Sequence, residues 1–314
     1  MEMREVVIVA AVRTAVGRSK GVLSHVRADD MAADVLQEAV QRAGINKEQV
    51  DDVILGCVTQ TAEQGGNIAR TALLMAGFPD SVPGVTIDRQ CGSSQQAVHF
   101  AAQAILAGDM DIVIAGGVES MSRVPMGTNM KNAHLGNRLQ ENYNIIHQGL
   151  SAEKIAEKWS LSKKQLNSYA YESHQRALAA IEAGSFKDEI LPIEVIQEDG
   201  TVATVVKDEG PRAETTVDIL NGLKTVFQED GVITAGNASQ MSDGASAVVV
   251  MALDKAQELG IQPLAKIITR VVVGSDPTLM LTGPIEATRK ALERSGLNIE
   301  DIDTYEVNEA FAPV

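Results

Sequence analysis

The 314-residue sequence has few cysteines, few aromatic residues and too few bases to balance its acids. Its two cysteines, Cys57 and Cys91, cannot build a disulfide framework, which favours a reducing, cytoplasmic setting. Ten aromatic residues offer no stacking platform, and a net charge of −15 argues against nucleic acid or an anionic membrane as the main partner. No apolar run approaches the ~20 residues that span a bilayer. A phosphate-bearing small molecule stays possible, because a helix N-terminus or a local cationic cluster can hold one.

What the chain does contain is an alternation of strand and helix patterns over residues 1–117. The N-terminal residues mix charges with a short apolar run, which indicates the start of a strand and not a secretory signal. Strands are predicted at 6–12, 53–58, 85–87 and 111–115, and helices at 28–43, 66–77 and 95–106. Such alternation is typical of an α/β layer with crossover connections.

Cys91 stands between a predicted strand end and a predicted helix start. Gly92, Ser93 and Ser94 follow it and open the helix. A sulfur at a helix N-terminus meets unpaired N–H groups and the positive end of the helix dipole, which favour the thiolate, the nucleophilic form. A buried, inert cysteine is the alternative for an isolated residue of this type. Cys57, within a predicted strand, is interpreted as a packing residue.

The middle of the chain, residues 118–244, has a different character. Loops rich in Gly, Asn and Met surround a helical stretch at 151–184, which carries a capping-box signature from Ser162 to Gln165. The lysines of this stretch are interpreted mainly as a solvated face.

The third part of the chain repeats the first. Residues 39–51 align with 291–303 at a constant offset of 252, and six of the thirteen positions are identical. Self-similarity at fixed spacing indicates duplication. The repeat predicts a strand at Tyr305–Val307 to match Val53–Leu55. It also leaves the second copy without a counterpart of residues 63–117, so we expect this sequence to be truncated at its C-terminus.

Four motifs together resemble the thiolases, and the resemblance covers the whole chain. They are Cys91-Gly92-Ser93-Ser94, residues 115–122 (AGGVESMS), residues 234–239 (TAGNAS) with Asp243-Gly244-Ala245, and residues 308–312 (NEAFA). The resemblance implies two similar α/β domains in a five-layered αβαβα sandwich with an inserted loop domain. The second domain would be incomplete. The implied division is 1–117 (N-terminal domain), 118–244 (CoA-binding loop domain) and 245–314 (start of the C-terminal domain).

The reaction implied by the resemblance is a thioester Claisen condensation or its reverse. A cysteine matching Cys91 takes the acyl group from acyl-CoA, and a second acyl-CoA loses an α-proton and attacks the acyl-enzyme. Both steps develop an oxyanion, so oxyanion holes are required. In the family, one hole uses a histidine and a water held by an asparagine. The other uses backbone N–H groups, including that of the nucleophile.

Carried over by position, Cys91 is the expected nucleophile and Asn308 the holder of the oxyanion-hole water. The resemblance also implies contacts with coenzyme A or its acyl group, at His147, Arg212, Phe227, Ala235, Ser239, Met241, Met280, Ala310 and Phe311. It implies no metal and no permanently bound cofactor, only CoA thioesters as substrates, and a homodimer or homotetramer. For Met280 and Phe227, general packing is the favoured interpretation over a specific contact. His147 could be a ligand contact or a surface histidine.

Two departures from the family leave the acyl chain length open: Gln148 replaces a common methionine, and Glu286 replaces a proline. None of the five histidines lies at the position of the family's general base, and the second catalytic cysteine has no counterpart. We therefore expect little turnover from this chain. The leading interpretation is a thiolase acting on acetyl-CoA or acetoacetyl-CoA. The alternatives are a degradative 3-ketoacyl-CoA thiolase, a ketoacyl synthase, and a non-catalytic CoA-binding or assembly subunit.

Overall fold

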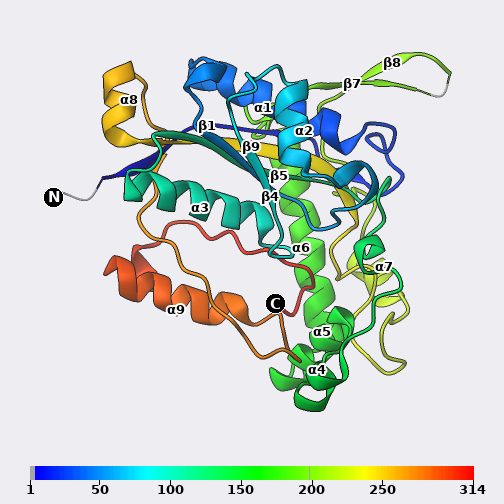
Figure 1. The fold of residues 1–314 in the computed structure, drawn as a ribbon. Helices are drawn as coiled ribbons and strands as arrows, with labels where there is room; N and C mark the ends of the chain where they lie inside the picture. Colours follow the sequence, from blue (N-terminus) through cyan, green and yellow to red (C-terminus); the bar gives the residue numbers. More distant parts are fainter. Residues whose placement is uncertain (1–3, 198) are drawn as a thin grey trace. The chain divides into compact units, whose positions relative to one another are not determined.

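The computed structural model describes residues 4–197 and 199–314, which divide into two compact units (Figure 1). Unit 1 comprises residues 1–131, 184–210 and 241–267. Unit 2 comprises residues 132–183, 211–240 and 268–314. Among the described residues, no helix is long and apolar enough to cross a membrane.

A mixed eight-stranded sheet forms the centre of unit 1. Its main path runs β10-β1-β9-β5-β3-β4, with β2 paired to β9 and β6 paired to β1. β3, β4 and β5 are parallel to one another, whereas β9 is antiparallel to both β1 and β5. The bounds are β1 Val6–Thr14, β2 Gly17–Arg18, β3 Asp52–Gly56, β4 Gly84–Ile87, β5 Ile112–Ser120, β6 Ile190–Leu191, β9 Ser242–Ala252 and β10 Ala265–Lys266. A separate hairpin joins β7 (Ile193–Ile196) to β8 (Val202–Val205).

Helices cover both faces of this sheet. α1 (Ala28–Ala43) and α2 (Ile68–Met75) lie on one face, and α3 (Ser93–Ala107) lies on the other (Figure 1). Each face has its own apolar cluster, because strand side chains alternate between the two sides. α8 (Leu253–Leu259) follows β9 directly, and short 3-10 turns occur at Lys47–Gln49, Ala62–Gln64 and Thr128–Met130. Unit 1 is thus a helix–sheet–helix sandwich, as the alternating pattern predicts.

The strands and helices predicted for residues 1–117 all occur in the structure, with bounds within about five residues of those predicted. α1 has the predicted bounds because Gly44 ends it in the left-handed conformation, with φ of 65°. α3 begins two residues before the predicted start, and β5 extends five residues beyond the predicted end. β3 ends at Gly56, so Cys57 lies just after the strand and not within it.

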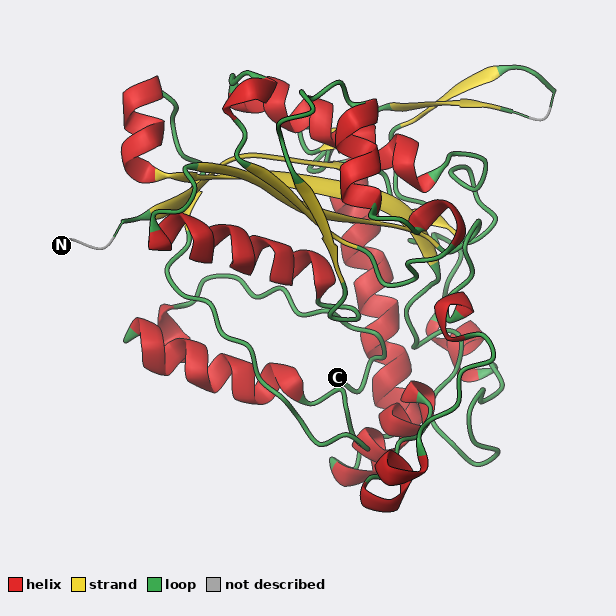
Figure 2. Cartoon of the chain, in the orientation of Figure 1, coloured by secondary structure: helices red, strands yellow, loops and turns green. Residues whose placement is uncertain are grey.

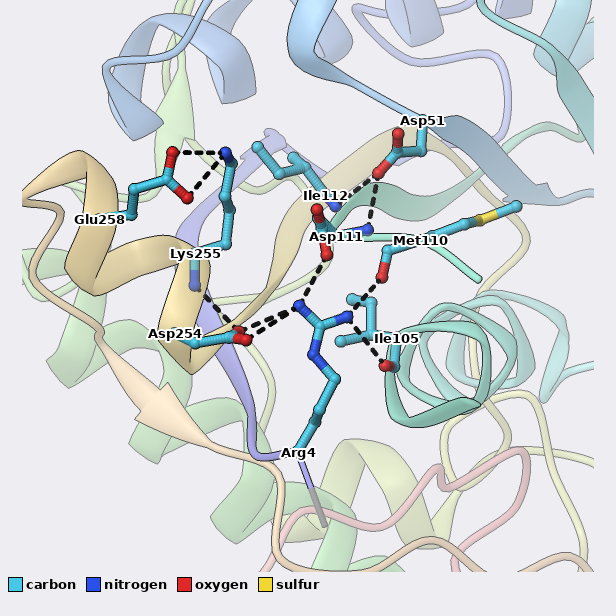
Figure 3. A network of polar contacts seen from close by, with 9 residues as sticks. All are labelled: Arg4, Asp51, Ile105, Met110, Asp111, Ile112, Asp254, Lys255 and Glu258. Atoms are coloured by element: carbon cyan, nitrogen blue, oxygen red, sulfur yellow. Dashed lines mark hydrogen bonds and ion pairs between the residues drawn. The ribbon is translucent and has the colours of Figure 1, made fainter. Parts of the chain in front are cut away.

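Arg4 joins the amino end of β1 to the carboxyl end of α3 (Figure 3). Its guanidinium donates to the carbonyl oxygens of Ile105 and Met110, at 3.5 and 3.3 Å, and to the carboxylates of Asp111 and Asp254, at 2.6 and 3.0 Å. A cation beside the last carbonyls of a helix complements the helix dipole. This network fixes the end of α3 opposite to Cys91.

Unit 2 contains five α-helices, and every residue of this unit is described by the structure. The bounds are α4 Asn137–Asn142, α5 Gln148–Lys158, α6 Lys163–Glu182, α7 Val217–Asn221 and α9 Gly283–Ser295. The predicted stretch 151–184 is two helices and not one, because Ser160 adopts a positive φ of 53° between them. The predicted capping box is confirmed at the start of α6. Ser162 Oγ accepts from Gln165 N, and Gln165 Oε1 accepts from Ser162 N.

The repeat is visible in the backbone as well as in the sequence. α1 ends at Gly44 and α9 ends at Gly296, both left-handed, with φ of 65° and 71°. A 3-10 turn with an Asn capping box follows each of them, at Lys47–Gln49 and at Ile299–Asp301. All of these features are 252 residues apart, so the two segments fold alike.

The predicted strand at Tyr305–Val307 is wrong. Residues 302–309 form a loop without regular structure (Figure 2). In the first copy, β3 is held by β4 on one side and β5 on the other. Residues 304–308 have no partner strand among the described residues of unit 2, and an isolated strand cannot satisfy its backbone groups.

The compact units do not follow the three segments predicted from the sequence. β9 spans the predicted boundary at residues 244 and 245, yet all of it lies in the sheet of unit 1. The division 1–117, 118–244 and 245–314 therefore remains a prediction about sequence organisation.

Candidate active site

Cys91 lies on a tight turn between β4 and α3, and its side chain is exposed. The preceding residue, Gln90, has a positive φ of 48°, which is uncommon for a residue with a side chain. Ser93 stabilises the turn from within the helix: its Oγ accepts from Arg89 N at 2.9 Å and donates to Gln90 O at 2.5 Å. Asp88 Oδ1 also accepts from Gln90 N, at 2.6 Å. The turn presents the thiol at the amino end of a 15-residue helix.

Glycines in the two neighbouring strands let the start of α3 lie against the sheet. Gly56, the last residue of β3, pairs with Ile87 of β4 and with Gly117 of β5. A Cβ on Gly56 would lie 2.4 Å from Ser94 N, and a Cβ on Gly117 would lie 2.8 Å from Ser94 Cβ. A real Cβ atom essentially never makes non-bonded contacts this short, so the position of the Cys91 turn depends on glycine here. The site lies where parallel strands end, which is a common place for active sites in α/β proteins.

The AGGVESMS motif and the Asp243-Gly244-Ala245 part of the third motif meet at this edge of unit 1. β5 and β9 pair so that Glu119 is opposite Gly244 and Ser120 is opposite Asp243. The buried Asp243 carboxylate accepts from Ser120 Oγ at 3.1 Å and from Ser122 Oγ at 2.5 Å. Glu119 accepts from Val58 N and from Gln64 Nε2, at 2.8 and 2.7 Å. These polar residues therefore support the loops around the strand ends.

Cys57 is a packing residue, as predicted. Its side chain is 1% exposed, and Gln64 Nε2 lies 3.6 Å from its sulfur. Burial, followed by the nearby negative charge of Glu119, raises the pKa of the Cys57 thiol to about 12. Since a thiol is nucleophilic only when ionised, Cys57 is a poor nucleophile at neutral pH.

In unit 2, three of the predicted ligand contacts form one aromatic cluster. The His147 ring stacks on Phe227 with centroids 5.1 Å apart, and Phe227 packs edge-on against Phe311 at 5.8 Å. His147 also caps α5, because its Nδ1 accepts from Gly149 N at 3.1 Å. A Cβ at position 149 would lie 2.4 Å from the Phe227 ring, so glycine is required there. His147 is exposed, Phe227 half-buried and Phe311 buried.

The TAGNAS and NEAFA motifs meet beside this cluster, also within unit 2. Ala238 forms an antiparallel bridge with Phe311. Ser239 N donates to Ala310 O, and Ala312 N donates to Asn237 O, each at 2.9 Å. The buried Asn237 side chain accepts from Thr234 N and donates to Asn167 of α6, at 2.9 and 3.0 Å. The TAGNAS and NEAFA motifs are therefore one structural feature, which places Ser239 next to Ala310.

The remaining predicted residues lie elsewhere. Arg212 is exposed, and its backbone N donates to His174 Nδ1 of α6 at 3.3 Å. Met280 is half-buried with φ of 35°, in a turn where Asp276 O accepts from Met280 N at 2.7 Å. Ala235 and Asn308 are exposed in unit 2, whereas the exposed Met241 belongs to unit 1.

Some residues that shape these features are not evident from the sequence. The positive φ of Gln90 has no sequence signal, because glutamine rarely adopts it. Tyr169 of α6 donates its hydroxyl to Glu309 in the NEAFA motif, a contact between residues 140 positions apart.

Comparisons with known proteins agree with this geometry. The family described as "Thiolase, N-terminal domain" matches residues 6–254, and "Thiolase, C-terminal domain" matches residues 261–314. The chain belongs to the thiolase family. An acetyl-CoA acetyltransferase from Pseudomonas aeruginosa is 44% identical over 99% of this chain and 82% of that relative. A steroid 3-ketoacyl-CoA thiolase from Mycobacterium tuberculosis is 45% identical over 99% of this chain and 78% of the relative.

A solved thiolase structure shows the same fold. The crystal structure of the Bacillus anthracis acetyl-CoA acetyltransferase superimposes with a TM-score of 0.90 at 43% identity, covering 99% of this chain and 81% of the other. The predicted thiolase-like α/β fold is confirmed. The chain spans about four-fifths of the length of these relatives.

Proposed function

We propose that this thiolase transfers an acyl group between CoA thioesters through an acyl intermediate on Cys91. The reaction is the condensation of two acetyl-CoA molecules to acetoacetyl-CoA, or the reverse thiolysis. The observation that supports it best is the exposed Cys91 thiol on the strained turn at the amino end of α3. Cys57, the other cysteine of the sequence, is buried and hard to ionise.

The first half-reaction can be written with the groups of unit 1. The Cys91 thiolate attacks the thioester carbonyl, the new carbon–sulfur bond forms, and the CoA thiolate leaves with its electron pair. The N-terminal N–H groups and dipole of α3 stabilise the attacking thiolate. In the condensation, a second acetyl-CoA loses its α-proton to water, and the resulting carbanion attacks the acyl-Cys91 carbonyl and expels the Cys91 thiolate. In the reverse thiolysis, the Cys91 thiolate attacks the 3-keto carbon of acetoacetyl-CoA, the carbon–carbon bond breaks, and acetyl-CoA leaves as a carbanion that takes a proton from water. CoA thiolate then attacks the acyl-Cys91 carbonyl and releases the cysteine as a thiolate. Asn308 would hold the water that donates to the thioester oxyanion.

Unit 2 is proposed to bind coenzyme A. The exposed side of the His147–Phe227 stack is an apolar and aromatic surface suited to the pantetheine chain or the adenine ring. Ser239 and Ala310, joined by a backbone hydrogen bond, border the same cluster. Arg212 would supply a cation for phosphate, and Ala235 and Met280 would line the path of the acyl-pantetheine chain along unit 2. A contact of Met241, which belongs to unit 1, with the acyl-CoA is a separate part of the proposal.

The acyl chain length is a separate proposal. The relatives include both acetyl-CoA acetyltransferases and 3-ketoacyl-CoA thiolases at nearly the same identity, so their names do not decide between the two. We propose the acetyl substrate first and the degradative 3-ketoacyl-CoA thiolase as the alternative. A cytoplasmic location and a homodimer or homotetramer are further parts of the proposal.

We also propose that residues 1–314 turn over slowly by themselves. The family's general base would accept the thiol proton of Cys91, and no histidine of this sequence matches its position. His147 is used as a helix cap, and His174 accepts a hydrogen bond from the Arg212 backbone. Loss of one member of a catalytic unit commonly lowers the rate by orders of magnitude.

The test is CoA-dependent cleavage of acetoacetyl-CoA by the wild-type chain and by Cys91→Ala, with Cys57→Ala as the matched control. Binding of CoA is measured in parallel by calorimetry. Slow turnover that disappears in Cys91→Ala and persists in Cys57→Ala supports the proposal. Rapid Cys91-dependent turnover would overturn the claim of slow catalysis. CoA binding without any Cys91-dependent acyl transfer would favour the non-catalytic CoA-binding subunit.

A further inference from the structure

The segment that carries Asn308 has little regular structure to hold it. Residues 302–309 form a loop, and residues 303–309 are exposed. A loop of this kind samples many backbone conformations unless side chains restrain it. An amide that orients a catalytic water must be held within a fraction of an ångström, so Asn308 needs restraints from outside its own segment.

Restraints are visible on both sides of Asn308. Before it, the Tyr305 hydroxyl donates to Ile299 O at 2.6 Å. After it, Ala310 O and Ala312 N pair with Ser239 N and Asn237 O. Between these two points, the Tyr169 hydroxyl donates to the Glu309 carboxylate. This contact is the one nearest to Asn308 in the chain.

Tyr169 sits on a well-supported helix. The capping box of Ser162 begins α6, and two residues before Tyr169 the buried Asn167 binds Asn237 and Asn221 at 3.0 and 2.9 Å. The same Asn237 backbone pairs with Ala312. α6, the TAGNAS segment and the NEAFA segment therefore form a closed loop of contacts within unit 2, and the Tyr169–Glu309 hydrogen bond is one side of it.

We propose that Tyr169 is a positioning residue that, through its hydrogen bond to Glu309, holds Asn308 in place for acyl transfer. The inference rests on the proposed function, because Asn308 needs a fixed position only if it stabilises an oxyanion. Tyr169 is 48% exposed, and an interaction this close to solvent adds little to the free energy of unfolding. Its expected effect is therefore a local restraint on the 302–309 loop. The bond raises the pKa of the Tyr169 hydroxyl, which keeps this donor protonated.

The experiment uses four variants of the same chain. Tyr169→Phe removes the donor, Glu309→Ala removes the acceptor, and Glu309→Gln keeps a carbonyl oxygen that can still accept. Tyr171→Phe is the matched control, because it removes a hydroxyl two residues further along α6. Hydrogen–deuterium exchange of the 302–310 segment reports the restraint directly. The rate of Cys91 acetylation at saturating acetyl-CoA and the half-saturating concentration report the function.

Exchange in residues 302–310 should rise about tenfold in Tyr169→Phe and Glu309→Ala, and stay close to wild type in Glu309→Gln and Tyr171→Phe. The saturated acetylation rate should fall about tenfold in the first two variants with an unchanged half-saturating concentration, and the double variant should lose no more than either single one. Unchanged exchange in Tyr169→Phe would overturn the restraint. Faster exchange with an unchanged acetylation rate would overturn the positioning role. Failure of wild type to acetylate Cys91 refutes the proposed function instead, and with it the role assigned to Asn308.

Discussion

Gly56→Ala is the substitution that best tests how the sheet positions the nucleophile. The added methyl would lie 2.4 Å from Ser94 N, 2.5 Å from Ser93 C and 2.7 Å from Ser93 Cβ. Two of these atoms belong to the backbone of the α3 first turn, so no side-chain rotation relieves the clash. Because non-bonded carbon atoms prefer about 3.5–4.0 Å, the amino end of α3 must move away from β3 by roughly 1 Å.

This displacement should affect both stability and chemistry. Overpacking of a well-packed core typically costs about 1–3 kcal/mol, which corresponds to a fall in melting temperature of roughly 2–12 °C. A shift of about 1 Å in a reacting group can lower a rate by about 10²-fold. We therefore expect Gly56→Ala to slow Cys91 acetylation far more than its stability loss alone would suggest at 20 °C.

The assay combines thermal unfolding with the rate of Cys91 acetylation by acetyl-CoA. Gly274→Ala is the control, because a Cβ at that position meets nothing within 4 Å. It should leave both quantities close to wild type. If Gly56→Ala melted within 1 °C of wild type and acetylated at the same rate, the argument that close contact with β3 positions the turn would be refuted.

Three further predictions concern residues away from this contact. Arg4→Ala should lower the free energy of unfolding by about 1 kcal/mol at pH 7, since Asp254 is largely exposed. The hydrogen bond to Arg4 lowers the pKa of Asp254, so its contribution exists above the unfolded pKa near 3.9 and is lost as the pH falls through the lower folded value. Urea unfolding should thus show a smaller difference between Arg4→Ala and wild type at pH 3 than at pH 7, and an unchanged difference would contradict this. Iodoacetamide at pH 8 should modify Cys91 in the native protein and Cys57 only after denaturation, because burial raises the pKa of Cys57 to about 12. A peptide map reports the labelling of each cysteine. Equal labelling of both in the native protein would show that Cys57 is accessible and refute the prediction. Burial, followed by Arg212, lowers the pKa of His174, so the fold favours the neutral ring that accepts from Arg212 N. The stability contributed by the neutral His174 ring is present above pH ~6.5 and is lost as the pH falls through the lower folded pKa. The melting temperature of His174→Gln should therefore fall less than that of wild type between pH 7.5 and pH 5. An equal fall in both proteins would contradict this prediction.

Much of unit 1, and the start of α6 in unit 2, could be predicted because the signals are local. The helix bounds of α1 follow from apolar periodicity and from Gly44, which ends the helix in a conformation that glycine adopts easily. The turn at Cys91 follows from a β-branched strand end and a run of small residues. The capping box at Ser162 follows from the spacing of two side chains. Each of these patterns carries its own physical cause within a few residues.

The wrong strand at Tyr305–Val307, and two pairings that the sequence does not indicate, depend on distant partners. The Tyr305–Val307 segment has strand-like residues and matches β3 in the repeat, yet strands require neighbours, and β3 has β4 and β5 on its two sides. β9 belongs to the sheet of unit 1 because it pairs with β1 and β5, which no local pattern indicates. Likewise, the sequence shows the TAGNAS and NEAFA motifs as separate, and only the Ala238–Phe311 bridge joins them.

The candidate site divides in the same way. Cys91 could be predicted from its surroundings, whereas most of the CoA contacts came from resemblance to the thiolases. The structure brings three of these residues together, since His147, Phe227 and Phe311 form a single aromatic cluster. For Ala235, Met241 and Met280 the predicted roles remain predictions.

The central claim is that Cys91 is the acyl acceptor, and mass spectrometry of the protein after mixing with acetyl-CoA tests it most directly. Peptide mapping should place one acetyl group on Cys91 and none on Cys57, with loss of the label on adding excess CoA. A Cys91→Ala variant should remain unlabelled. Acetyl label on Cys57, or on lysines alone while Cys91 stays free, would contradict the assignment of Cys91 as the nucleophile.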